Sequence, residues 1–187
     1  MHKYILFLRL ALALVIMGVF ATGPRLALAD SAAEIDREVD SALAKLYATT
    51  PKAKELSKMA KGVLVFPDVF KGGFILGAQH GEGALRKGGR TVGYYNTVEA
   101  SYGLQAGAQS FGYALFFMTD SALEYLEKSA GLEIGTGPSL VLVDSGMAKS
   151  LSTSTLQDDI YAFIFDQEGL MAGVGLKGSK ISKITPE

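Results

Sequence analysis

Residues 62–97 read GVLVFPDVFKGGFILGAQHGEGALRKGGRTVGYYNT, and the spacing of glycine in this stretch decides the fold. Short apolar or alternating runs are cut by glycines at close intervals, a pattern typical of antiparallel strands joined by tight turns. The KGG tripeptide at 87–89 is the clearest hairpin signal. Small residues on one face of a strand let another backbone or a ligand approach closely, at a cost in strand stability. The stretch therefore predicts a tightly curved sheet or a barrel.

The second half of the chain continues the same pattern. Further strands are expected at residues 101–119, 132–143, 160–166 and 170–181, with a helix at 121–129. DIYAFIF at 159–165, followed by the turn residues DQEG at 166–169, predicts a hairpin whose return strand is 170–182. GFILGAQ and GLQAGAQ share the spacing G-x-x-x-G-A-Q, thirty residues apart. Common packing in one sheet explains this echo more simply than a duplication does.

Residues 31–60 carry helical signals instead. Ser31 and Glu34 have the spacing of a capping box. Apolar residues then recur at helical spacing, at Ile35, Val39, Ala42, Leu43 and Leu46. Thr50 and Pro51 suit the cap and first turn of a second helix, whose apolar residues are Leu56, Met59 and Ala60. The prediction is one α+β domain over 30–187, with N-terminal amphipathic helices packed on a curved, glycine-rich, mainly antiparallel β-sheet or barrel.

The first 29 residues have the features of a secretory signal peptide. Lys3 and Arg9 precede an apolar run from Leu10 to Phe20, and ALAD at 27–30 offers a cleavage site after Ala29. A membrane anchor is the alternative, but the run is shorter than the roughly 20 residues that span a bilayer. We therefore expect a periplasmic or secreted protein that can also sit peripherally on a membrane.

Charge and cysteine content exclude several classes of protein. Cleavage after Ala29 removes Lys3, Arg9 and Arg25 from the 18 basic residues and none of the 19 acidic ones, which leaves a net charge of −4. Such a surface has no overall attraction for nucleic acid or anionic membrane, so anion binding requires a local patch. Without cysteine the chain forms no disulfide and offers no thiol nucleophile or thiolate metal ligand.

One stretch, GVGLKGSKI at 173–181, matches the phosphate-binding pattern G-x-G-x-x-G. A nucleotide site would need a helix opening at the third glycine and an acidic residue about 20 positions later. The following SKISKITPE is too β-branched for that helix, so we expect no nucleotide. His80 is the one histidine beyond residue 29, and no G-x-S-x-G elbow or clustered metal ligands accompany it. The sequence predicts no enzyme, cofactor or metal.

Basic side chains provide the candidate binding residues. They are Lys52, Lys54, Lys58 and Lys61 along the second helix, Arg86, Lys87 and Arg90 at the KGG hairpin, Lys177 and Lys180 with Lys183 beyond them, and Lys71 beside Phe66 and Phe70. A solvated face is the plain interpretation of each cluster. The functional interpretation is a phospholipid headgroup site, because ammonium groups beside exposed apolar residues suit a membrane interface.

Residues 159–181 resemble the SYLF domain family, whose hallmark is an IY-x-Y/F strand, a turn and then GL-F/M-AGV-x-L-x-G. The matching residues are Ile160, Tyr161, Phe163, Gly169, Leu170, Met171, Ala172, Gly173, Val174, Leu176 and Gly178. The resemblance extends over most of residues 35–184. It implies a lipid-binding module, since eukaryotic members bind phosphoinositides and some fungal members bind actin. For an exported bacterial chain it implies membrane phospholipid.

Three functions follow as hypotheses. The first is a non-catalytic module of the cell envelope that binds anionic phospholipid through a basic, partly apolar patch. The second is a protein-interaction or scaffold domain of the envelope without direct lipid binding. The third, a hydrolase, would depend on His80.

Overall fold

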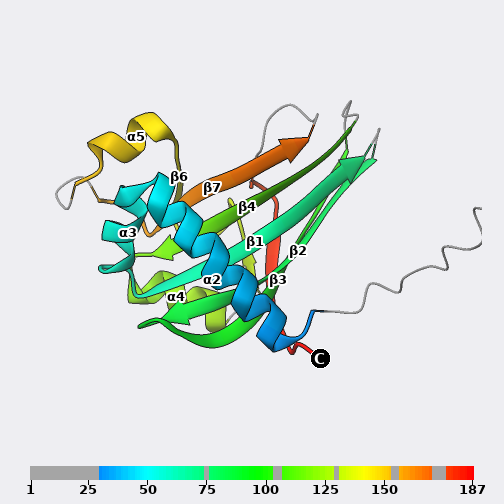
Figure 1. Ribbon diagram of the computed structural model, residues 1–187, viewed down its shortest axis with the longest axis horizontal. Coiled ribbons are helices and arrows are strands. Elements are labelled where there is room, and N and C mark those ends of the chain that lie inside the picture. Colours follow the sequence, from blue (N-terminus) through cyan, green and yellow to red (C-terminus); the bar gives the residue numbers. More distant parts are fainter. Residues whose placement is uncertain (1–29, 74–75, 103–106, 129–130, 153–155, 170–175) are drawn as a thin grey trace, which may run out of the picture.

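The computed structural model describes residues 30–73, 76–102, 107–128, 131–152, 156–169 and 176–187. One eight-stranded sheet dominates these residues, and helices lie against it (Figure 1). The strands are β1 (Gly62–Gly73), β2 (Leu76–Lys87), β3 (Arg90–Tyr102), β4 (Gly107–Phe117), β5 (Leu132–Glu133), β6 (Leu140–Val143), β7 (Ile160–Gly169) and β8 (Lys180–Ile184). The helices are α2 (Ala32–Thr49), α3 (Pro51–Ser57), α4 (Asp120–Lys128) and α5 (Ser145–Ser150).

The sheet is curled but open, so it forms a half-barrel rather than a closed barrel. Its strand order is β5-β8-β3-β2-β1-β4-β7-β6, which leaves β5 and β6 as the two edges. Neighbouring strands pair antiparallel, except that β6 runs parallel to β7. The predicted α+β class and the mainly antiparallel sheet are therefore confirmed.

The inside of the curl holds the larger hydrophobic cluster. It joins residues of β5 and β8 to residues of β7, close to the two edges of the sheet, and α4 contributes Ala122, Leu123 and Leu126. Phe66 and Tyr113 pack ring to ring in it, with centroids 4.8 Å apart. Because this cluster connects strands from both sides of the sheet, we call its face concave.

The opposite, convex face packs against α2 and α3. Ile35, Val39 and Leu46 of α2 lie in one cluster with Val65 and with other residues of β1, β2, β4 and β7. Figure 1 shows α2 crossing in front of the strands. The apolar stripe of α2 thus follows from its helical spacing, because these positions fall on one side of the helix.

The helices α2 and α3 begin at the capping residues that the sequence indicates. Ser31 Oγ accepts a hydrogen bond from the backbone N–H of Glu34 at 3.3 Å, so the predicted start of α2 is confirmed. Thr50 is the N-cap residue of α3 but makes no capping hydrogen bond with its side chain, and Pro51 occupies the first turn. The helix expected at 121–129 is found as α4, one residue earlier.

The predicted hairpin of 159–165 with 170–182 is wrong. β7 continues through the DQEG residues and pairs with β4 and β6, whereas β8 pairs with β3 and β5. Asp166 and Gly169 have positive φ angles of 49° and 115°, and the register with β4 shifts beside them. The turn-like residues therefore form a bulge within one strand. Residues 170–175 of the expected return strand lie outside the described residues.

The single strand expected at 132–143 is also wrong. This segment supplies two short strands, β5 and β6, at opposite edges of the sheet. Glycines at 135 and 137 and Pro138 interrupt the segment between them. The short helix α5, which the sequence analysis does not predict, follows β6, and Asp144 caps it by accepting from Met147 N–H at 2.7 Å.

Candidate functional site

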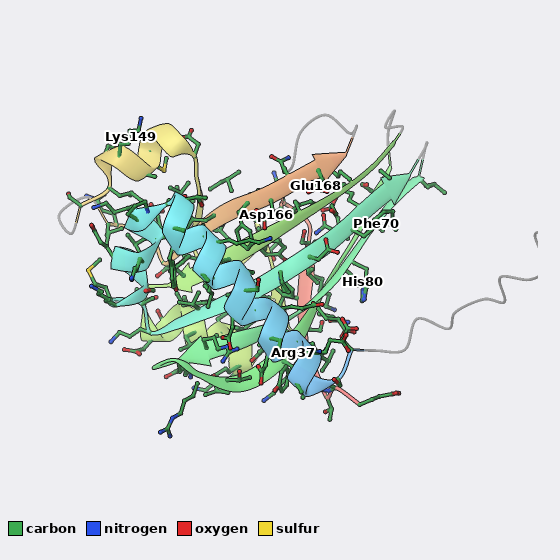
Figure 2. All side chains as sticks on the ribbon, in the orientation of Figure 1. Arg37, Phe70, His80, Lys149, Asp166 and Glu168 are labelled. Atoms are coloured by element: carbon green, nitrogen blue, oxygen red, sulfur yellow. The ribbon has the colours of Figure 1, made fainter. Side chains whose placement is uncertain are left out.

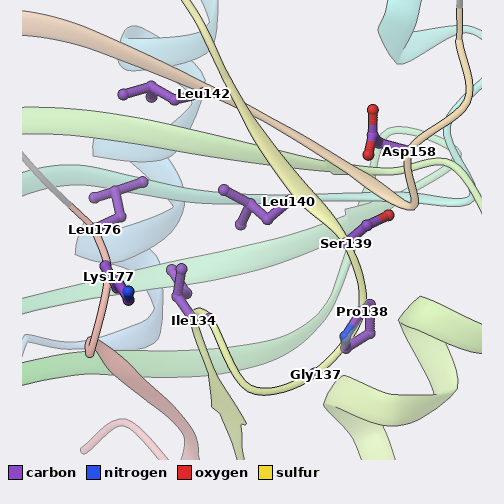
Figure 3. A pocket seen from close by; sticks show the side chains of 10 residues that line it. Ile134, Gly137, Pro138, Ser139, Leu140, Leu142, Asp158, Leu176 and Lys177 are labelled. Carbon is purple, nitrogen blue, oxygen red and sulfur yellow. The ribbon is translucent and has the colours of Figure 1, made fainter.

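The two edges of the half-barrel enclose a cavity of about 550 Å³, which we call the edge slot (Figure 3). The residues between β5 and β6 form one wall, β6 forms another, and the residues just before β8 form a third. Its lining is Ile134, Gly135, Gly137, Pro138, Ser139, Leu140, Leu142, Asp158, Leu176 and Lys177. The slot therefore lies where the curled sheet stops short of closing.

The floor of the edge slot is apolar and continuous with the concave core. Ile134 and Leu176 are 5% and 4% exposed and belong to the concave cluster, and Leu140 packs against it. Leu142 is 43% exposed at the rim. Figure 3 shows Ile134, Leu140 and Leu176 around one space. An apolar floor that opens to solvent suits an apolar chain.

Lys177 supplies a cation at the rim of the edge slot. Its side chain is exposed and forms no ion pair within the described part of the chain. Gly135 lies beneath its stem, because a Cβ atom at Gly135 would stand 3.4 Å from Lys177 Cγ. Gly135 also has a φ of 104°, a conformation that favours glycine. The slot thus places an apolar floor next to a lysine ammonium group.

Asp159 fixes the segment from which β6 begins. Its Oδ2 accepts hydrogen bonds from Ser139 N–H and Ser139 Oγ, both at 3.1 Å, and its Oδ1 accepts from Thr119 Oγ1 at 2.9 Å. These bonds, the one from Thr119 first, hold the pKa of the Asp159 carboxyl below its ordinary value. This geometry ties the slot wall at Ser139 to Thr119, which follows the end of β4.

Acid is expected to loosen this anchor. A carboxyl whose pKa is lower in the folded than in the unfolded chain stabilises the fold above its unfolded pKa, and that stability is lost as the pH falls through the folded value. Asp159→Asn should therefore flatten the dependence of the urea midpoint on pH below about 4. Asp158→Asn is the matched control, because no hydrogen bond to that carboxylate occurs among the described residues. Equal pH profiles for the two variants would contradict this role.

Ion pairs occupy five of the eleven basic residues proposed from the sequence. Lys52 pairs with Glu55, Lys61 with Asp120, Lys71 with Glu99, Arg86 with Asp36 and Asp40, and Lys87 with Glu127, at distances of 2.5–3.4 Å. Six candidates form no ion pair within the described ranges: Lys54, Lys58, Arg90, Lys177, Lys180 and Lys183. Paired cations are less available to an outside anion, so these six, Lys177 among them, are the stronger candidates.

The structure does not gather the basic residues into one patch. The end of α3 and the KGG hairpin lie together, since Ser57, Ala60, Gly88 and Gly89 line one shallow pocket. Lys177 and Lys180 belong instead to the segment at the edge slot and β8. The structure also does not form the surface expected from Lys71, Phe66 and Phe70. Phe66 is fully buried, Lys71 is 8% exposed on the concave face, and Phe70 is 57% exposed on the convex face.

No catalytic or metal geometry appears in the part of the chain that the structure describes. The His80 side chain is exposed on β2 (Figure 2). Its charged neighbour is Glu82, with His80 Nε2 4.0 Å from Glu82 Oε1. Groups of three or more metal-ligating side chains do not occur among these residues. None of the described helices combines the length and apolar character needed to cross a bilayer.

Comparison with known families identifies the region that holds the edge slot. Residues 98–186 match the family model Ysc84, described as "Las17-binding protein actin regulator". The match runs from within β3 through β8 and so includes every residue that lines the slot. No curated protein matches the chain. The resemblance to the SYLF family is thereby confirmed, because residues 98–186 match the model of the Ysc84 (SYLF) family.

Proposed function

We propose that this protein binds anionic phospholipid without chemical turnover, with an acyl chain in the edge slot and the phosphate beside Lys177. The observation that carries the proposal is the apolar cavity of about 550 Å³ with Lys177 at its rim, a lysine that has no ion-pair partner among the described residues. Ligand pockets commonly have volumes of about 300–1,000 Å³ and an apolar lining with a few polar groups. The match of residues 98–186 to the Ysc84 (SYLF) family model supports a lipid or protein ligand in general terms.

The charge distribution favours a local rather than a general attraction to membranes. The chain carries a formal net charge of −1, and removal of residues 1–29 would make it more negative. Lys177 lies beside Leu176 and Gly135, so its stem can rest on apolar surface while the ammonium group meets a phosphate. We place the protein in the periplasm or outside the cell, peripheral to a membrane, after cleavage behind Ala29. Mass spectrometry of the protein purified from exporting cells would establish its N-terminus.

Vesicle binding should depend on the edge slot. Leu142→Trp is expected to obstruct the slot. Lys177→Glu should weaken partitioning into phosphatidylglycerol vesicles by about 10-fold or more, since each basic residue near an anionic surface contributes about 1 kcal/mol. The measurement is co-flotation of the purified protein at low and high salt, where added salt should reduce the electrostatic part.

The matched control for this experiment is Lys54→Glu. Lys54 is exposed on α3, far along the chain from the slot, and it too forms no ion pair within the described residues. The proposal requires that Lys54→Glu reduce binding much less than Lys177→Glu does. If both lysine variants lose the same amount, binding reflects general surface charge and the slot has no special role.

Exposed apolar residues on the convex face favour a second candidate, a protein-interaction domain. Phe70, Leu76 and Val98 are 57%, 71% and 40% exposed on strands that continue beyond α2. Figure 2 places Phe70 near the far end of β1. Under this alternative, crosslinking in intact cells would recover a discrete envelope protein, and Phe70→Asp would abolish the crosslink while vesicle binding remained.

A further inference from the structure

A row of polar side chains crosses four strands on the concave face. Glu99 of β3 lies opposite Gln79 of β2, Gln79 lies opposite Lys71 of β1, and Lys71 lies opposite Gln109 of β4. We call these four residues the polar row. Lys71, Gln79 and Gln109 are only 8%, 2% and 4% exposed, although buried side chains of these types are uncommon.

The polar row is only partly satisfied by its own contacts. Lys71 Nζ donates to Glu99 Oε1 at 2.9 Å, Ser179 Oγ donates to Glu99 Oε2 at 3.2 Å, and Gln79 Nε2 donates to Ser179 Oγ at 3.3 Å. Two buried atoms of the row, Gln79 Oε1 and Gln109 Nε2, have no hydrogen-bond partner in the part of the chain that the structure describes. Native proteins leave few buried polar atoms unpaired, so two in one row call for an explanation.

The unpaired groups are mainly donors. An ammonium group carries three N–H bonds, and Glu99 is the one acceptor that Lys71 Nζ contacts among the described residues. The amide nitrogen of Gln109 carries two more. Gln79 Oε1, by contrast, requires a donor. The group that complements the row is therefore rich in oxygen acceptors and also bears at least one hydroxyl.

Three glycines lie beside the polar row, where neighbouring strands approach closely: a Cβ atom at Gly73 would collide with the carbonyl oxygen of Leu76 and with Cα of Gly77. Gly73 lies opposite Gly77 on β2 and opposite Gly107 on β4. Each of them is two residues from Lys71, Gln79 or Gln109, so the two sets share the concave face. This arrangement explains the echo in the sequence. Each GAQ supplies one glycine and one glutamine, and the two copies flank Lys71 on either side.

We propose that the polar row binds a phosphate ester that carries a hydroxyl on an adjacent carbon, the chemistry of a glycerol phosphate group. Phosphate oxygens accept from Lys71 and Gln109, and the hydroxyl donates to Gln79 Oε1. The site lies on different strands from the lining of the edge slot, so it does not depend on the function proposed above. Its ligand is either a soluble ester or the headgroup of a glycerophospholipid.

The test is a titration of the ¹⁵N-labelled full protein with sn-glycerol 3-phosphate, followed through the side-chain amide signals of Gln79 and Gln109. Saturable shifts of both signals, weaker with inorganic phosphate or glycerol, support a soluble ester. Shifts that occur only with phosphatidylglycerol vesicles, and not with phosphatidylcholine vesicles, support a headgroup. Absence of saturable shifts with every probe would overturn the proposal and leave the unpaired atoms to buried water.

Gln109→Leu separates binding from a structural role. The variant removes a buried unpaired donor, so we expect an unchanged or higher melting temperature together with at least a tenfold loss of affinity for the probe that binds. Ser110→Ala is the matched control, because Ser110 is the next residue and points to the convex face. A lower melting temperature with unchanged affinity would show that Gln109 supports the fold and binds nothing. The Leu142→Trp result bears on the edge slot alone.

Discussion

Replacing Lys71 by methionine is expected to lower the free energy of unfolding by about 3–5 kcal/mol. The side chains of Lys71 and Glu99 are only 10% and 9% exposed, and their charged atoms are 2.9 Å apart. The variant leaves the Glu99 carboxylate buried with Ser179 as its remaining partner. A buried charge without its counter-ion is costly, because the protein interior solvates it poorly. Urea unfolding followed by circular dichroism measures the loss.

A double variant and an exposed pair give this prediction its controls. Lys71→Met combined with Glu99→Gln removes both charges and should recover most of the lost stability. Lys45→Met breaks the pair with Asp166, whose side chains are 63% and 47% exposed, and should cost less than about 1 kcal/mol. Equal losses for Lys71→Met and Lys45→Met would show that the concave pair is solvated.

Phe116→Ala is expected to cost a similar amount, about 3–5 kcal/mol, for an apolar reason. Phe116 is fully buried on the convex face, in the cluster that contains Val39 and Leu46 of α2. Its ring meets the Phe163 ring edge to face, with centroids 5.2 Å apart. Truncation removes these contacts and leaves a cavity beneath the helix. The loss is measured from the urea midpoint and slope.

The same substitution at Phe70 is the matched control. Phe70 is also on the convex face, but it is 57% exposed on the part of β1 beyond α2. Phe70→Ala should change the free energy of unfolding by no more than about 0.5 kcal/mol. A large loss at Phe70 would mean that another surface covers it in solution, and a small loss at Phe116 would mean that α2 does not seal the face.

Helix starts could be predicted from the sequence because they depend on short-range chemistry. The Ser31 cap requires only a hydroxyl three residues before a backbone N–H, and Pro51 requires only a free first turn. The apolar spacing from Ile35 to Leu46 similarly identifies the buried side of α2. Curvature followed from the glycines, although the sequence left open whether the sheet closes.

Strand partners could not be predicted in the same way. Successive strands are usually neighbours, so a turn-like DQEG between two apolar runs favours a hairpin. In the structure Asp166, with its positive φ, lies at a bulge within β7. β7 pairs with β4 and β6 and not with the strand that follows it. Which strands pair with one another depends on which faces must be covered across the whole sheet. No local pattern in residues 159–182 contains that information.

In the candidate site, too, local features could be predicted from the sequence, whereas contacts between distant segments could not. Basic residues are visible in a sequence, but the acids that pair with them are distant along the chain, as Arg86 and Asp36 illustrate. The edge slot combines residues 134–142 with Leu176 and Lys177, which only the curl of the sheet brings together. The polar row was signalled by the repeated GAQ, whose meaning depends on the strand that lies between the two copies.

The strand order also fixes the sequence of events by which the sheet can assemble. β1 to β4 are consecutive in the chain and occupy adjacent positions, whereas β8 joins β3 and β7 joins β4 from much later in the chain. Contacts between distant segments form slowly because long loops must close first. A newly made chain is therefore expected to pass through a four-stranded intermediate in which the edge strands, β3 and β4, have unpaired backbone groups. Such edges can pair with another copy, so yield should fall as the protein concentration during refolding rises.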